Sequence, residues 1–244
     1  LIQDVTEAFE EGELHRVYNR LHNFCAVRMS SIYFDALKDR LYCSGPDWRA
    51  RRSAQTALHN ILLTLVRLCA PILVHTAEEI WSHIEHPGED VQSVHLAHWP
   101  KPGDEWENDR LHARWTRLLD VRDDILRVVE TLRDADEVSK AMETRVTLHS
   151  TDQDLQNLLR QRKDVLQEML MVSELEIAAD APSGDHGTAV QEGESEPSLT
   201  VSVSPASHEK CDRCWNLKPT VGQHEEHPDL CTRCITAVEE LQEG

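Results

Sequence analysis

Four cysteines near the C-terminal end of the chain are arranged in two pairs. They are Cys211, Cys214, Cys231 and Cys234, with two residues inside each pair and sixteen residues between the pairs. Two thiolates at this spacing form a tight knuckle around a metal ion, and two knuckles complete a tetrahedron of sulfur. The spacing therefore predicts a site for one Zn²⁺ ion. Because four sulfur ligands leave no open coordination position, we expect a structural ion that supplies folding energy to residues 206–244.

Two histidines between the cysteine pairs and three cysteines earlier in the chain also have side chains that could bind a metal ion. His224 and His227 lie between the cysteine pairs and are alternative zinc ligands. We expect the four cysteines to bind the ion and both histidines to be exposed loop residues, because the two knuckles already satisfy zinc. Cys25, Cys43 and Cys69 lie at or near apolar helix faces, and we expect them to be buried packing residues. Paired thiols without a disulfide framework are typical of a reducing compartment.

Basic residues gather in one part of an otherwise acidic chain. The formal net charge is -19, which argues against general binding of polyanions. Residues 14–77 nevertheless hold nine basic residues against three acidic ones, a local net charge of +6. Among them, Arg49, Arg51 and Arg52 open a predicted helix, where the helix dipole disfavours positive charge. Guanidinium groups pair with phosphate, so a nucleic-acid contact explains this placement, and a solvated helix face is the alternative.

The spacing of apolar residues predicts four helices in the first hundred residues, at about 14–24, 32–41, 47–69 and 76–84. We expect Asp47 to cap the third helix and Thr76 to open the fourth with a capping box completed by Glu79. Pro71 separates these two helices. This pattern predicts a helical bundle over residues 1–100.

A mixed region follows the predicted bundle. The pattern predicts a helix at 107–133 and a second helix at 152–171. The expected inner face of the first consists of Leu111, Trp115, Leu118, Leu119, Ile125 and Val129. Strands are predicted at 144–149, 175–178 and 199–203, and a flexible acidic loop at about 180–197. We therefore expect a mainly α chain with three parts: the bundle at 1–100, a small α+β connecting domain at 101–205, and a zinc ribbon at 206–244.

The ends of the sequence and its hydropathy bear on location. Membrane spans need about 20 consecutive apolar residues, a run that this sequence lacks, and its start does not read as a signal peptide. We expect a cytoplasmic location, no membrane partner and a monomeric state. The chain begins with Leu1 and a helix-like pattern follows almost at once, so we expect it to be a piece of a longer protein.

Several segments are similar to those of a known family. In the helical part they are Phe24-Cys25-Ala26-Val27, Ser31-Ile32-Tyr33-Phe34-Asp35, Lys38-Asp39-Arg40-Leu41-Tyr42, residues 50–58 and residues 70–81. These segments resemble the anticodon-binding helical domain of bacterial isoleucyl-tRNA synthetases. Residues 209–215 and 230–234, which hold the cysteine pairs, resemble the zinc module that ends the same enzymes. The resemblance covers nearly the whole chain and is weakest over residues 107–203.

This resemblance implies a class I aminoacyl-tRNA synthetase, which joins isoleucine to its tRNA with ATP, and the chain looks like its C-terminal third. The bundle would then receive the anticodon stem and loop of tRNA(Ile), and the zinc module would fold back to help hold the tRNA. The expected tRNA contacts are Arg49, Arg51, Arg52, Arg213 and Trp215. Trp215 follows its cysteine directly and is either a stacking platform for a base or the packing residue of the module.

The catalytic signatures of such enzymes, HIGH and KMSKS, do not occur in the sequence. The resemblance therefore implies that ATP binds in a catalytic domain outside this chain, that an editing domain also lies outside it, and that the chain alone is inactive.

Two other functions compete with this one. A related four-cysteine ribbon ends the formamidopyrimidine-DNA glycosylases, which would require an N-terminal Pro nucleophile and a helix-two-turn-helix domain, and the sequence shows neither. A protein-interaction module is the third interpretation, in which the basic segment is incidental.

Overall fold

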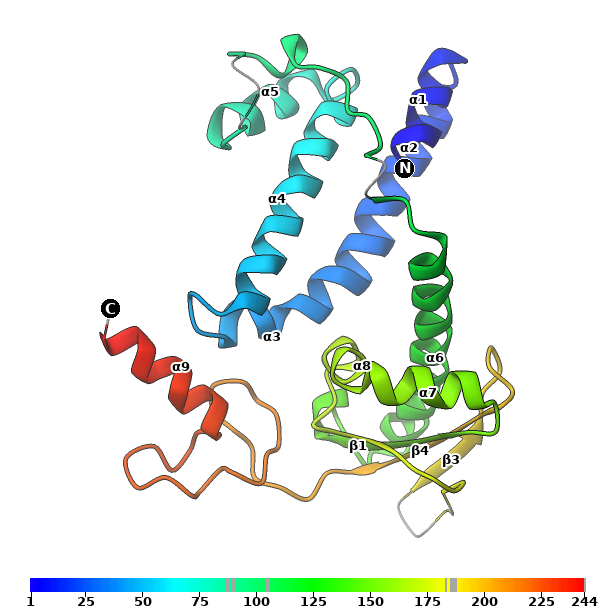
Figure 1. The fold of residues 1–244 in the computed structure, drawn as a ribbon, viewed down its shortest axis with the longest axis vertical. Helices are drawn as coiled ribbons and strands as arrows, with labels where there is room; N and C mark the ends of the chain where they lie inside the picture. The colour runs from blue at the N-terminus through cyan, green and yellow to red at the C-terminus, as the bar shows by residue number, and fades with distance from the viewer. Residues whose placement is uncertain (87, 89–90, 104–105, 183, 185–187, 244) are drawn as a thin grey trace. The chain divides into compact units, whose positions relative to one another are not determined.

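The computed structural model describes all residues except 87, 89–90, 104–105, 183, 185–187 and 244. The chain folds into two compact units, each built from two stretches of sequence. Unit 1 consists of Leu1–Phe34 with Asp47–Asn108, and unit 2 consists of Asp35–Pro46 with Asp109–Gly244. Helices dominate the element order, so the expected mainly α fold is confirmed (Figure 1). Among the described residues, the helices are too short or too polar to cross a membrane.

Unit 1 is helical. Its elements are α1 (Ile2–Glu10), α2 (Leu14–Asn23), the π-helix η1 (Phe24–Phe34), α4 (Arg49–Cys69), α5 (Val74–His83) and the short 3₁₀-helix η2 (Val94–Leu96). Two small apolar clusters hold them together: one packs α1 and α2 against Leu68, and the other surrounds the buried Trp81 of α5. Trp99 closes the first cluster, because its indole N–H donates to Thr6 Oγ1 at 2.8 Å.

The starts of two helices in unit 1 differ from the prediction. The N-cap of α4 is Trp48 rather than Asp47, and an indole offers no oxygen to accept the first N–H groups. Helix α5 begins at Val74, so Thr76 lies inside it and the predicted capping box is wrong. The turn after Pro71 returns to helical geometry early, with the N–H of Ala77 already bonded to the carbonyl oxygen of Leu73 at 2.8 Å.

The predicted second helix is also different. The sequence predicts two separate helices at 14–24 and 32–41, but the structure is helical without a break from residue 14 to residue 43. α2 continues into the π-helix η1, and η1 continues into α3 (Asp35–Cys43), which belongs to unit 2. A π-helix has a wider turn than an α-helix, so it moves side chains off the face that an α-helical spacing predicts. Cys25 lies in η1 and is exposed, which corrects its expected burial, whereas Cys69 is half-buried and Cys43 is buried.

Unit 2 combines one sheet with several helices. Besides α3 it contains α6 (Asp109–Asp134), the 3₁₀-helix η4 (Ala141–Glu143), β1 (Thr144–Ser150), α7 (Gln153–Gln161), α8 (Lys163–Leu170), β2 (Glu174–Ile177), β3 (Ala189–Glu192), β4 (Leu199–Pro205) and α9 (Thr232–Glu243). The sheet order is β2-β1-β4-β3, with β1 parallel to β2 and the other pairs antiparallel. The predicted helix at 152–171 is divided at Arg162 into α7 and α8.

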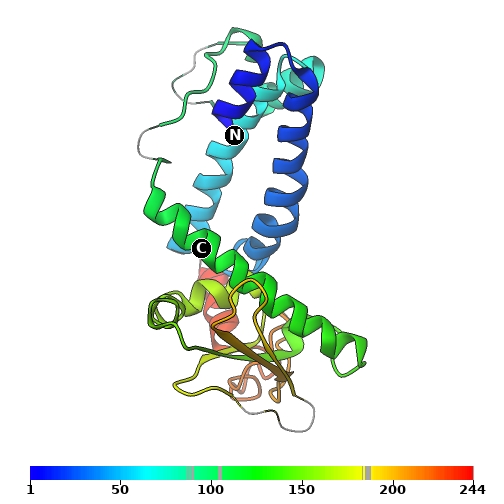
Figure 2. The ribbon, with the colours of Figure 1, turned by 90° about the vertical axis from the view of Figure 1, so that its right-hand side faces the viewer.

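The core of unit 2 lies between one face of the sheet and the helices α6, α7 and α8 (Figure 2). Leu148 of β1 pairs in register with Val201 of β4, and both side chains are fully buried. Ile125 of α6 is fully buried in the same core. Leu111 and Trp115, predicted on the inner face, are exposed because they precede the part of α6 that packs in this core.

The predicted acidic loop at 180–197 contains a strand, which corrects that expectation. Residues 183 and 185–187 of it lie outside the described residues. β3 pairs with β4 as a short strand at the end of the sheet order. The turn after it is fixed by the buried carboxylate of Asp124, which accepts the backbone N–H groups of Glu194, Ser195 and Glu196 at 3.0–3.1 Å. These contacts come from a distant helix, so local periodicity does not reveal them.

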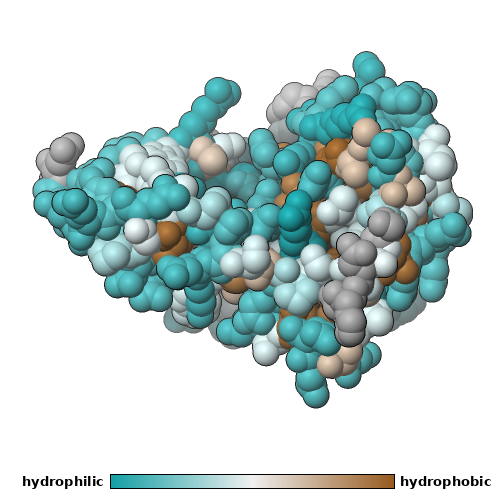
Figure 3. Space-filling model, turned by 90° about the horizontal axis from the view of Figure 1, so that it is seen from below, coloured by the Kyte–Doolittle hydropathy of each residue, from teal (hydrophilic) through white to brown (hydrophobic). Residues whose placement is uncertain are grey.

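One face of the molecule is mostly hydrophilic. Figure 3 shows one face on which hydrophobic side chains appear in small areas between polar ones.

The compact units also differ from the predicted domains, since residues 35–46 fold with the C-terminal stretch rather than with the bundle. The predicted boundaries near residues 100 and 205, as limits of functional domains, stay predictions.

Candidate metal centre

The four predicted cysteine ligands come together in unit 2. All four are buried, and their sulfur atoms lie within 4.8 Å of one another. Cys214 Sγ and Cys231 Sγ are 3.9 Å apart. Zn–S bonds of about 2.3 Å place the sulfurs of a tetrahedron at roughly 3.8 Å from each other. The donor set and its spacing therefore fit one zinc ion.

Backbone hydrogen bonds shape both knuckles. In the first, the N–H of Trp215 donates to the carbonyl oxygen of Cys211 at 2.8 Å, and Trp215 adopts a left-handed conformation with φ 64°. In the second, the N–H of Cys231 donates to Cys211 Sγ at 3.3 Å, which links the two knuckles. α9 begins at Thr232, so its N-terminal turn carries the second knuckle and its dipole favours thiolate charge there.

Thiolates this close together repel one another, because each carries a negative charge. Hydrogen bonds from the thiols of Cys231 and Cys234 lower the pKa of Cys214. Hydrogen bonds with Cys214 and Cys231, together with burial, raise the pKa of Cys234. A divalent cation removes this conflict because it stabilises all four thiolates at once. The cluster is thus a structural zinc site and leaves no sulfur for catalysis.

The two histidines of the module do not belong to the cluster. His224 and His227 stack on each other, with ring centroids 5.7 Å apart, and the backbone N–H of His227 donates to His224 Nδ1 at 3.2 Å. Both are half-buried rather than exposed as expected. The metal-binding group found in the described part of the chain consists of the four cysteines.

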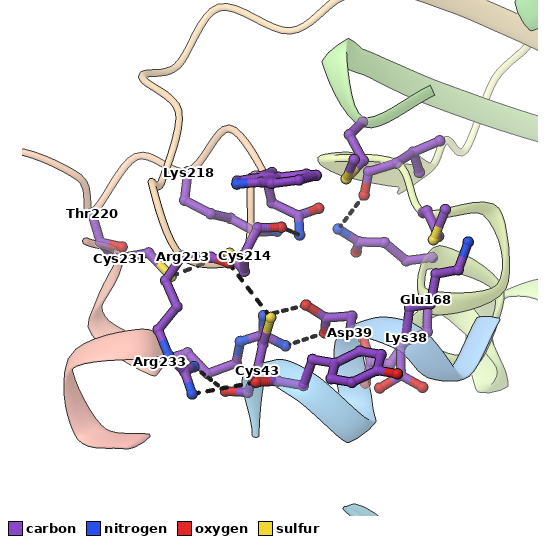
Figure 4. A pocket seen from close by; sticks show the side chains of 18 residues that line it. Lys38, Asp39, Cys43, Glu168, Arg213, Cys214, Lys218, Thr220, Cys231 and Arg233 are labelled. Carbon is purple, nitrogen blue, oxygen red and sulfur yellow. Dashed lines mark hydrogen bonds and ion pairs between the residues drawn. The ribbon is translucent and has the colours of Figure 1, made fainter. Parts of the chain in front are cut away.

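Two arginines join the zinc module to α3, which lies in the same unit (Figure 4). The guanidinium of Arg233 forms a bidentate ion pair with the carboxylate of Asp39, with one N–O distance of 2.7 Å. Arg213 donates to the carbonyl oxygens of Cys43 and Tyr42, which belong to the last turn of α3. Positive charge at a helix C-terminus is favoured by the helix dipole.

A groove of about 770 Å³ lies between α3, α8 and the zinc module. Two aromatic side chains line it: Trp215, which is 52% exposed, and Tyr42, which is also exposed. The ammonium groups of Lys140 and Lys210 each lie 5.5 Å from the centroid of the Trp215 ring. Trp215 is therefore an open aromatic surface beside positive charge, rather than a buried packing residue.

The five predicted tRNA contacts fall in both units. Arg49, Arg51 and Arg52 occupy the first turn of α4 in unit 1, where Arg49 and Arg52 are exposed and Arg51 is half-buried. Arg52 donates to Gln55 Oε1 at 2.9 Å within the same helix. Arg213 and Trp215 belong to unit 2. Their role in binding tRNA stays a prediction.

Sequence reasoning missed the residues that hold α3 to the metal module. Asp39 and Arg233 are 194 positions apart, so local periodicity carries no sign of their pairing. One signal was present: both cysteine pairs have the form Cys-X-Arg-Cys, which places an arginine before the second ligand of each knuckle. Tyr42 was likewise overlooked as an exposed aromatic of the groove.

Two protein families match this chain. Residues 1–148, which are more than half of the chain, match the family described as the anticodon-binding domain of tRNA ligase. The chain belongs to that family. Residues 209–237, which contain all four zinc ligands, match a zinc finger found in FPG and IleRS.

Three curated relatives of the chain are isoleucine–tRNA ligases. Isoleucine–tRNA ligase of Syntrophotalea carbinolica is 41% identical over 96% of the chain and 24% of its own length. The enzyme of Moorella thermoacetica is 41% identical over 99% of the chain and 26% of its own length, and that of Brachyspira hyodysenteriae is 40% identical over 97% of the chain and 25% of its own length. The chain thus spans about a quarter of the length of these relatives.

The matches discriminate between the competing interpretations. The zinc finger occurs both in FPG proteins and in the ligases, so it does not decide between them. The anticodon-binding family covers the helical part, and the ligase relatives cover nearly the whole chain. The glycosylase and the interaction module are therefore not favoured.

Proposed function

We propose that this anticodon-binding protein is the C-terminal tRNA-binding portion of an isoleucine–tRNA ligase, and that it holds the anticodon region of tRNA(Ile). The observation that carries the proposal is the order of two matched parts on one chain, an anticodon-binding domain followed by a zinc finger. In this proposal, ATP binding and aminoacyl transfer take place in catalytic and editing domains outside this chain. The chain works in the cytoplasm and is monomeric.

The first contact surface is the N-terminal turn of α4. Arg49, Arg51 and Arg52 lie there together, and acidic residues are absent from that turn. A helix N-terminus with its own dipole already attracts phosphate, and guanidinium groups add charge-assisted hydrogen bonds. Contacts of this kind set the position of the RNA backbone.

The second contact surface is the groove of unit 2. Trp215 and Tyr42 offer aromatic faces on which unstacked bases of an anticodon loop can stack, and Lys140 and Lys210 supply nearby positive charge. Arg213 is already engaged with the end of α3, so we assign the base contact to Trp215 and give Arg213 a supporting role.

Charge reversal at Arg51 and Arg52 tests the first surface. R51E/R52E should weaken binding of a tRNA(Ile) transcript by at least about tenfold, and should lower the slope of log K against log salt by about one for each phosphate that an arginine no longer neutralises. The measurement is a titration at two salt concentrations, with duplex DNA as the competing ligand. We expect tRNA to bind more tightly than the duplex.

The matched control is R160E/K163E, which reverses two exposed charges at the junction of α7 and α8. This variant should bind tRNA like the unmodified chain. Equal affinities for the two double variants, or equal affinities for tRNA and duplex DNA, would contradict the proposal.

A further inference from the structure

Each cysteine knuckle carries one arginine, and both arginines point to the same helix. Arg213 precedes Cys214, and Arg233 precedes Cys234. Arg213 donates to the backbone oxygens at the end of α3, and Arg233 pairs with the Asp39 carboxylate one turn earlier. Two separate contacts therefore fix both the position and the rotation of α3 against the metal module.

Each arginine also contacts a cysteine of the opposite knuckle. Arg213 Nη1 lies 3.8 Å from Cys234 Sγ, and the guanidinium of Arg233 interacts electrostatically with Cys214. Nη1 of Arg213 contacts both Cys234 Sγ and the carbonyl oxygen of Cys43, and both terminal nitrogens of Arg233 bind the Asp39 carboxylate. Figure 4 shows both side chains between the cysteines and α3.

The charges of the loaded site match this arrangement. Four thiolates exceed the two positive charges of a zinc ion by two negative charges, and the two guanidinium groups, one of which also pairs with the Asp39 carboxylate, offset part of this excess. The ion also holds the two knuckles at a fixed distance, so both arginines keep the spacing that α3 requires. Without the ion, the coordination bonds that join the knuckles are absent.

We propose that Arg213 and Arg233 are positioning residues through which zinc binding clamps α3 in place. The clamp gives the structural zinc a specific task beyond folding its own module: it orders a helix whose contact residues lie 170 to 194 positions earlier in the sequence. Arg40 supports α3 from another side by an ion pair with Glu168 of α8, which does not involve the module. Zinc therefore controls one set of the contacts that hold α3.

Hydrogen–deuterium exchange of residues 35–43 tests the clamp in the full chain. Four samples are compared: the zinc-loaded chain, the chelated chain, zinc-loaded D39N and zinc-loaded K38A. D39N removes the carboxylate charge that Arg233 binds without touching a zinc ligand. K38A is the matched control, because Lys38 pairs with Asp35 inside the same helix at 2.6 Å.

Chelation and D39N should each make exchange in α3 about tenfold faster, as expected when a charge-assisted hydrogen bond is removed, while exchange in β1 stays unchanged. K38A should exchange like the zinc-loaded chain. D39N should still hold one zinc per chain at saturating zinc, measured by metal analysis. Equal exchange of α3 with and without zinc, or exchange in D39N equal to that in K38A, would overturn the clamp.

A consequence for tRNA rests on the proposed function, because α3 borders the groove assigned to the anticodon loop. Zinc-loaded chain should then bind tRNA more tightly than chelated chain. If α3 exchange depends on zinc and tRNA binds neither form, the clamp stands and the proposed function fails. If tRNA binds but α3 exchange ignores zinc, only the clamp fails.

Discussion

Gly193 follows β3 at a point where two oxygen atoms occupy the space that a Cβ atom would need. A Cβ atom at this position would lie 2.5 Å from the carbonyl oxygen of Glu196, and closer still to Asp124 Oδ2. Neither oxygen has room to retreat, since Asp124 is buried and holds the turn through three backbone N–H groups. The position therefore requires a glycine, because the turn at residues 194–196 and the Asp124 carboxylate leave no room for a side chain.

Replacing this glycine should destabilise unit 2. G193A should lower the free energy of unfolding by roughly 1–3 kcal/mol, the usual cost of forcing an extra carbon into a packed site. Urea denaturation of the full chain measures the effect. The control is G184A, whose Cβ would meet Val190 Cγ2 at an ordinary 3.5 Å. If both variants unfold at the same urea concentration as the unmodified chain, the tight turn is not the constraint described.

Among the site residues, the sequence predicts the zinc ligands but not their neighbours. Cysteine spacing identifies a site because the ligand geometry is local, with two residues inside each knuckle. The ion pair of Arg233 with Asp39 depends on the packing of α3 beside the module, which no local pattern encodes. For the same reason the sequence predicts Arg213 as a contact for tRNA, whereas in the structure its guanidinium donates to the carbonyl oxygen of Cys43 at the end of α3.

The turn between β3 and β4 links three elements through one carboxylate. Burial alone would raise the pKa of Asp124, but the backbone N–H groups of Ser195, Glu196 and Glu194 and the guanidinium of Arg127 outweigh it, so the pKa lies below 3.8. A carboxyl group with a depressed pKa stabilises the fold above its unfolded value and loses this contribution as the pH falls through its folded value.

Acid should therefore weaken unit 2 through Asp124. The free energy of unfolding should fall as the pH drops below 3.8, and D124N should show a flatter pH dependence together with lower stability at neutral pH. Urea unfolding between about pH 2 and about pH 7 measures both. The comparison variant is D123N, whose carboxylate is exposed beside Arg122. A D124N profile parallel to that of the unmodified chain would contradict the role given to this carboxylate.

Among the secondary-structure elements, long amphipathic helices and the central strands were predictable and the junctions were not. α6, β1 and β4 follow the expected spans closely because their buried faces repeat regularly. β3 was missed because its residues lie in an acidic stretch with Gly, Ser and Pro that shows no hydrophobic periodicity. η1 was missed because α-helical and π-helical windings share the same residue preferences over a short stretch, and only packing decides between them.

Across the whole chain, the division into units changes how the sequence is organised. Residues 35–46 come between two stretches of unit 1 but fold with unit 2, where α3 meets the zinc module. The sequence order alone assigns this segment to the bundle, because contacts between distant residues are invisible there. Each unit then contributes one surface to the proposed function: the first turn of α4 in unit 1, and the groove beside Trp215 in unit 2.

The net charge also acts on the molecule as a whole. A chain with a net charge of -19 repels polyanions, so specific binding must come from the local basic and aromatic surfaces. Selective recognition of one tRNA region is then expected, rather than general attraction to nucleic acid.

Binding of the zinc-loaded chain to two tRNA transcripts shows whether the chain recognises the anticodon. One transcript is tRNA(Ile), and the other differs from it only in the anticodon bases. If the chain holds the anticodon region, the changed transcript should bind about tenfold or more weakly, because a base that stacks on an aromatic side chain contributes about 1–3 kcal/mol. Equal dissociation constants for the two transcripts would contradict the proposed function.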